Sequence, residues 1–146
     1  MARSVDFHLY SAANTGEQIL DGISAGLLSF GDEVQWGARH LGLWLSMRVR
    51  ITAFQPPNYF QDTMIRGQFR YFRHDHLFEQ RGSATEMLDT VKFNSLWIFG
   101  RIVDLYVIGP HLRKFLALRN QTLKKVAESD EWRRFLPEAS RVELNK

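Results

Sequence analysis

A change in the spacing of apolar residues limits the fold more than any other feature of the sequence. Between residues 33 and 93, apolar side chains recur at every second position in successive segments, which is the period of a half-buried β-strand. Beyond Asn94, Leu112, Phe115 and later apolar residues recur at helical spacing, which predicts an amphipathic helix from about His111 to Glu128. A run of strands followed by one long helix predicts an α+β fold, with a curved antiparallel sheet whose apolar face the C-terminal helix covers.

Turn signals separate the predicted strands. Gly31-Asp32 precedes the alternating segment EVQWGARH, and Leu41-Gly42 separates it from WLSMRVRITAF. Pro56-Pro57-Asn58 ends that second strand, because proline has no N–H to donate to a sheet. The segment YFQDTMIRGQFRYFRHDHLFE is long enough for two strands, with Gly67 as a bend or bulge. A last alternating segment, TEMLDTVKF, completes the sheet.

Three other segments are less regular. Residues 12–22 are polar and contain glycine, which predicts a loop. Gly109-Pro110 should break or kink any helix that begins near Phe99. Trp132 and Phe135 predict a short tail that packs back on the body of the protein.

Length and composition favour one ordered domain over residues 1–146. The absence of cysteine excludes disulfides and thiolate metal sites and is typical of a reducing compartment, so we expect a cytoplasmic protein. The net charge of +3 is spread along the chain, which argues against nucleic-acid binding. Arg101 and Asp104 interrupt the longest apolar stretch, NSLWIFGRIVDLYVIG, so no membrane-spanning helix is expected.

The segment FRHDHLFE carries the most distinctive polar pattern. On a strand, His74 and His76 point to the same side, whereas Asp75 between them points away. Asp62 and Asp89 each interrupt an apolar strand face, where a carboxylate is costly unless it is paired. We therefore expect these two carboxylates to face the two histidines.

The residues alone leave four interpretations of this cluster open. It could be a polar network that fixes the sheet, an anchor for the polar end of a ligand, a metal site, or an acid–base pair. A metal site would need ligands beyond the two imidazoles, and we expect neither a metal nor a cofactor. Common enzyme motifs such as GxSxG, the P-loop and HExxH do not occur in the sequence. His8, His40 and His111 stand alone in the sequence and are expected at surface or half-buried positions.

Several motifs resemble those of a known family. They include the segments SAANTGEQ, GDEVQW and FLALRN, and the motifs FxPPxxFxD (Phe54–Asp62), RGxF (Arg66–Phe69), HxHxF (His74–Phe78) and MxD (Met87–Asp89). In this order, over nearly the whole chain, they resemble the SRPBCC group of START-like, polyketide cyclase/dehydrase-like ligand-binding proteins. The resemblance is strongest to a small bacterial branch with few known roles.

This resemblance implies a helix-grip fold, in which a seven-stranded antiparallel sheet wraps around a long C-terminal helix and a deep hydrophobic cavity. It implies binding of a small hydrophobic, lipid-like or polyketide-like ligand, or alternatively a cyclase or dehydrase with a histidine general base. The matching cavity residues would be Asp62, Arg66, His74, His76 and Asp89, with Trp36, Phe72, Met87 and Phe115 as apolar wall. The family's first strand has no counterpart here, and the exposed sheet edge would favour a homodimer.

Overall fold

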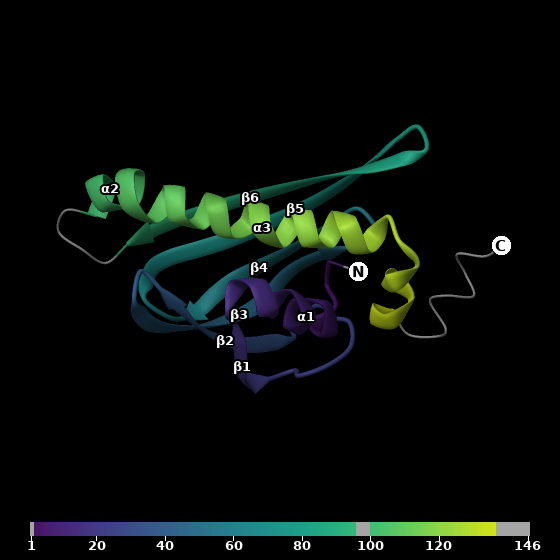
Figure 1. Cartoon of the computed structure of the whole chain (residues 1–146). Helices are drawn as coiled ribbons and strands as arrows, with labels where there is room; N and C mark the ends of the chain where they lie inside the picture. Colours follow the sequence, from purple (N-terminus) through teal and green to yellow (C-terminus); the bar gives the residue numbers. More distant parts are fainter. Residues whose placement is uncertain (1, 96–99, 137–146) are drawn as a thin grey trace.

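The computed structural model describes residues 2–95 and 100–136 of the chain. Its centre is a six-stranded antiparallel sheet in which the strands follow one another in sequence order. The sheet curves beneath one long helix, α3 (Gly109–Ala127) (Figure 1). The predicted α+β helix-grip architecture is therefore confirmed. The strands are β1 (Gln18–Gly22), β2 (Glu33–His40), β3 (Leu43–Gln55), β4 (Tyr59–Arg66), β5 (Phe69–Arg81) and β6 (Ala84–Ser95).

The hairpins form at the predicted turns. Between β2 and β3, Leu41 and Gly42 both have positive φ, 53° and 83°, which is the backbone of a two-residue hairpin turn that suits the twist of a sheet. Pro56 and Pro57 lie between β3 and β4. Gly67 belongs to the two-residue connection between β4 and β5, so the long segment does contain two strands.

A β-bulge lies close to the end of β4. Arg48 of β3 pairs with Arg66, but the next residue, Val49, pairs with Met64. Ile65 is therefore an extra residue without a partner on β3. Simple alternation places Met64 and Arg66 on the same face of the strand. Because one extra residue exchanges the two faces, the bulge puts Arg66 on the opposite face.

The N-terminal region differs from the predicted loop. Residues 12–15 belong to helix α1 (Val5–Thr15), and Gln18–Gly22 form the edge strand β1. The Ser4 side chain accepts a hydrogen bond from Phe7 N and so caps the helix. Gly16 ends it with a φ of 72°, which glycine adopts without strain. Local caps and burial of one helix face thus outweigh the polar composition of this segment.

The chain is helical on both sides of Gly109-Pro110. Helix α2 (Gly100–Val103) is followed by a π-helical segment, η1 (Asp104–Ile108), which leads directly into α3. Gly109 N–H bonds to Asp104 O, five residues back. Proline has no N–H and crowds the preceding turn, so a wider turn before it is a local remedy. The helix is therefore not broken at Gly109-Pro110, and the local irregularity is a π-helical turn just before it.

The core consists of two apolar clusters. The larger one joins the sheet, through Val34, Ile51 and Phe60, to the N-terminal residues Ala2 and Val5. In the smaller one, Phe7 of α1 packs with Val126 of α3 and with Phe135 of the 3₁₀-helix η2 (Asp130–Phe135). The predicted packing of the tail is thus confirmed. Among the described helices, none is long and apolar enough to span a bilayer.

Candidate functional site

A largely apolar pocket of about 480 Å³ lies between the inner face of the sheet and α3. Residues of β2, β3, β4, β5 and β6 line one side, and residues of η1 and α3 line the other. In Figure 1, α3 runs along the concave side of the sheet, so the residues of the sheet and of the helix face each other across the pocket. Among the apolar lining residues are Trp36, Leu45, Met47, Phe72, Val91, Leu112, Phe115 and Leu116.

The register of three neighbouring strands creates one polar cluster on this inner face. Asp62 of β4 stands opposite His74 of β5, and His76 stands opposite Asp89 of β6. Side chains of directly opposed residues lie close together on one face of a sheet. Two carboxylates and two imidazoles, the Asp–His cluster, are thus brought together by pairing alone.

Each carboxylate of the Asp–His cluster contacts both imidazoles. Asp62 Oδ2 lies 3.1 Å from His76 Nε2 and 3.7 Å from His74 Nδ1. Asp89 Oδ1 lies 2.8 Å from His76 Nδ1 and 3.3 Å from His74 Nε2. The two rings lie 3.8 Å apart, and Phe60 stacks on the outer face of His76 at 4.1 Å. The histidine side chains are almost completely buried.

Helix α3 closes the cluster from the other side. Arg119 Nη2 donates to Asp89 Oδ2 at 3.3 Å, and Asn120 Nδ2 donates to the same oxygen at 2.6 Å. Arg119 is buried, so its charge is not shared with bulk solvent. The helix is therefore tied to the sheet through a carboxylate that also contacts both histidines.

The contacts of the cluster set its protonation. Burial opposes the charged form of His76, but Asp62 and Asp89 outweigh it and raise the pKa of this histidine. Burial lowers the pKa of His74, which is therefore neutral at pH 7. Although burial acts to raise the pKa of Asp62 and Asp89, their histidine partners hold both pKa values below the usual range. When His76 is protonated, its charge and that of the Arg119 guanidinium balance the two carboxylates of the cluster.

Six of the nine predicted site residues line the pocket, namely Trp36, Asp62, Phe72, His74, His76 and Phe115. Asp89 is not among the lining residues but belongs to the Asp–His cluster. Met87 packs against the apolar core instead. Arg66 lies apart, as the bulge at Ile65 explains.

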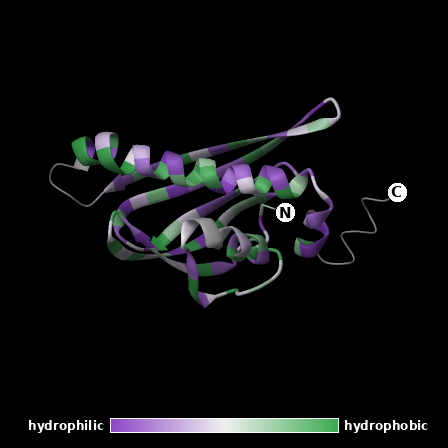
Figure 2. Cartoon of the chain, viewed as in Figure 1, coloured by the Kyte–Doolittle hydropathy of each residue, from purple (hydrophilic) through white to green (hydrophobic). Residues whose placement is uncertain are grey.

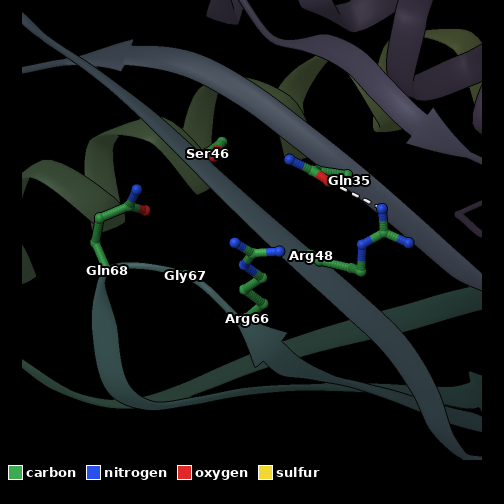
Figure 3. Close-up of a pocket in the computed structure, with 6 residues that line it drawn as sticks. All are labelled: Gln35, Ser46, Arg48, Arg66, Gly67 and Gln68. Carbon is green, nitrogen blue, oxygen red and sulfur yellow. Dashed lines mark hydrogen bonds between the residues drawn. The ribbon is translucent and has the colours of Figure 1, made fainter.

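Arg66 lines a second, polar pocket with Gln35, Ser46, Arg48, Gly67 and Gln68 (Figure 3). Gln35 and Arg48 alternate with the inner-facing residues of β2 and β3, so this hollow belongs to the other face of the sheet. Arg48 is already paired there with Asp21, Glu33 and Gln35. Arg66 thus does not line the pocket between the sheet and α3, where the family resemblance had implied it.

Simple sequence patterns missed several polar residues of the main pocket. Arg119 follows Phe115 by four residues and precedes Leu123 by four, so it lies on the apolar face of α3. A charged residue on an apolar helix face could have been predicted from the sequence as a site residue. His40 and His111 also line the pocket, and their Nδ1 and Nε2 atoms lie 2.9 Å apart. His8 lines it too, 3.0 Å from Ala2 O. His40 and His111 come together only through a tertiary contact, and His8 reaches the pocket from α1.

The geometry also bears on metal binding. One ligand atom from each of Asp62, His74 and His76 lies within 4.8 Å of the other two, and these are ligand types that zinc accepts. With His76 protonated, this histidine and Arg119 already balance the charges of the buried cluster. A metal ion would have to displace that proton and lie close to the guanidinium, so a hydrogen-bonding role fits the arrangement better.

Comparisons with solved structures place the architecture. The protein TTHA0849 from Thermus thermophilus aligns with a TM-score of 0.64 and 13% identity over 86% of this chain and 88% of that one. Ginseng major latex-like protein 151 from Panax ginseng aligns with a TM-score of 0.61 and 12% identity over 82% and 81%. Ara h 8.0201 aligns with a TM-score of 0.54 and 16% identity over 84% and 86%. The shared feature is the helix-grip fold.

At these identities the likeness is one of fold alone, and it agrees with the START-like architecture that the motifs implied. No protein-family model matches the sequence, and no curated protein matches it.

Proposed function

We propose that this protein binds a small, elongated apolar molecule in the pocket between the sheet and α3. The observation that carries the proposal is a largely apolar pocket of about 480 Å³ in which Asp62, His74 and His76 belong to one buried polar cluster. Pockets of this size and composition bind drug-sized or lipid-like molecules, and a few convergent polar groups fix their orientation. Apolar contact would supply most of the affinity, at roughly 25 cal/mol per Å² buried.

The charge balance of the cluster indicates the chemistry of the ligand's polar end. Because Asp62 and Asp89 are already matched by His76 and Arg119, a ligand carboxylate or ammonium would leave one buried charge without a partner. A hydroxyl or carbonyl group would not. His74 offers a neutral imidazole, which can donate or accept one hydrogen bond to such a group. The proposed ligand is thus an apolar molecule with an uncharged polar end.

Displacement of a fluorescent apolar probe, N-phenyl-1-naphthylamine, tests this proposal. We expect decanol to displace the probe at a concentration at least about tenfold lower than decanoate, because only decanoate would bring an unmatched charge into the pocket. Equal displacement by both would contradict the role of the cluster. Failure of the probe and of decanol to bind would contradict the function itself.

A pair of matched variants locates the binding site. Ala38 is buried and lines the pocket, so Ala38→Phe should fill part of it and weaken binding of the probe. Ala53 lies in β3 outside the pocket lining, so Ala53→Phe is the matched control. Equal affinity of the two variants would place the bound probe elsewhere. Thermal unfolding of both variants verifies that each still folds.

A further inference from the structure

One end of the molecule combines exposed apolar side chains with an opening of the pocket. Leu41 and Leu43 of the β2–β3 hairpin line the pocket and are also 59% and 65% exposed. Val107 of η1 likewise lines the pocket and is 45% exposed. A residue that both lines a pocket and meets solvent lies at its mouth. The hairpin and the helical segment are held together there by the contact between His40 and His111.

The apolar surface continues outward from this mouth along the helix. Ile102, Leu105 and Tyr106 of α2 and η1 are 61%, 62% and 72% exposed. Figure 2 shows hydrophobic residues at this end of the helical segment, alternating with hydrophilic ones. We call these three residues, with Leu41, Leu43 and Val107, the mouth surface. Large apolar side chains gathered in this way on the surface of a folded domain indicate an interaction site.

Five exposed arginines lie in or next to the elements that form this end of the molecule. They are Arg39 beside the hairpin, Arg66 and Arg70 on either side of the β4–β5 turn, Arg101 in α2 and Arg113 in the first part of α3. Within the described residues none of these five side chains has an ion-pair or hydrogen-bond partner. Among described residues 38–48, 64–72, 93–95 and 101–113 the single carboxylate is that of Asp104, which accepts a hydrogen bond from Ser95 N.

We propose that the mouth surface docks onto an anionic lipid membrane, with its apolar residues inserted at the interface and the arginines against the headgroups. Unpaired cations around a protruding apolar patch are the pattern of a protein that lies on a bilayer without spanning it. A second copy of the chain would place arginines against arginines, which argues against self-association through this face. Nucleic acid would leave the apolar centre without a partner. Docking there presents the pocket opening to the bilayer, whatever the pocket holds.

Flotation of the purified protein with lipid vesicles tests this inference. We expect binding to vesicles of phosphatidylcholine mixed with phosphatidylserine, weaker binding to phosphatidylcholine alone, and loss of binding as salt screens the arginines. Absence of binding to the anionic vesicles would overturn the proposal. This assay requires no pocket ligand, so its result is separate from the probe displacement described above.

Two pairs of double variants separate the apolar and the charged contributions. Leu105→Gln with Tyr106→Gln should weaken vesicle binding at least about tenfold. The control is Phe30→Gln with Leu88→Gln, since these residues are 67% and 57% exposed but lie away from the mouth. Equal effects in the two pairs would overturn the assignment of the surface.

For the charges, Arg39→Gln with Arg101→Gln should weaken binding about fivefold per arginine. Lys92→Gln with Lys125→Gln is the control, because it removes the same charge from other surfaces. Sedimentation velocity completes the test. The proposal would be overturned if the wild-type protein does not bind vesicles but self-associates, and if the Leu105 and Tyr106 changes abolish that self-association. This face would then be an interface between copies of the chain.

Discussion

At the scale of single residues, Arg119 connects the helix to the buried charges of the sheet. It is buried on the apolar face of α3 and pairs with Asp89, which in turn contacts His74 and His76. Such an arrangement is sensitive to the loss of one member, because the remaining charge stays buried. The same balance defines the proposed preference for an uncharged ligand end.

Replacement of Arg119 should therefore be costly. We expect Arg119→Met, which keeps the length but removes the charge, to lower the free energy of unfolding by about 3 kcal/mol. Arg113→Met is the control, since Arg113 is exposed on the same helix. Urea denaturation measures both. Equal stability of the two variants would show that the buried charge of Asp89 does not need the Arg119 guanidinium for its stabilisation.

His8 predicts a pH dependence of stability. Burial lowers its pKa to about 3, so the folded protein keeps this imidazole neutral where the unfolded chain, with a pKa of about 6.5, binds a proton. The contribution of neutral His8 to the free energy of unfolding is complete above about pH 6.5 and is lost as the pH falls. Between pH 6.5 and pH 5 the loss should be about 2 kcal/mol. The lowered pKa values of His40 and His74 act in the same direction, whereas the raised pKa of His76 opposes them.

Chemical denaturation at several pH values tests the contribution of His8. The variant His8→Gln has no titrating group at this position, so its stability should fall less steeply over this pH range. The amide of glutamine can still donate toward Ala2 O, which limits other effects of the change. An unchanged slope would assign the acid sensitivity to other groups.

At the scale of elements, caps and bulges decide what composition leaves open. Helix α1 begins at a buried serine, Ser4, whose side chain accepts from Phe7 N at 3.2 Å. The polar composition of residues 12–22, which include its last turn, otherwise suggests a loop. Similarly, the extra residue Ile65 redirects Arg66 without any unusual residue type. Both features depend on backbone geometry at one or two positions.

The cap of α1 can be tested by one substitution. We expect Ser4→Ala to lower the free energy of unfolding by about 1 kcal/mol, because an N-terminal N–H of the helix then loses its partner in a buried place. Ser24 is exposed, and Ser24→Ala should leave stability nearly unchanged. Thermal melts of both variants, followed by circular dichroism, measure the difference. Equal melting temperatures would contradict the role of the cap.

At the scale of the whole molecule, the pocket links the sheet to α3 and opens beside η1. A ligand that fills this pocket should bind the folded state alone, because the unfolded chain has no sheet and helix to enclose it. We therefore expect decanol at about one hundred times its dissociation constant to stabilise the protein by roughly 2.7 kcal/mol. The urea midpoint reports this gain, which should be smaller for Ala38→Phe than for Ala53→Phe. A gain of equal size in both variants would indicate solvent effects of the alcohol.

The sequence by itself determined the architecture, because apolar spacing reports directly which faces of strands and helices are buried. Five of the six strands, the long helix and the inward direction of Asp62, His74, His76 and Asp89 follow from periods of two and 3.6 residues. Asp75 was likewise expected outside the cluster, and it accepts a hydrogen bond from Tyr59 instead.

Only the tertiary structure decided which polar groups meet. The approach of Arg119 to Asp89, the pairing of His40 with His111, and the place of Arg66 depend on how α3 lies across the sheet and on one bulge in β4. The N-terminal helix gains stability from packing against distant residues such as Phe135, and the edge strand β1 from pairing with β2. Contacts between residues far apart in the chain leave no local period, so they become visible only once the elements are packed together.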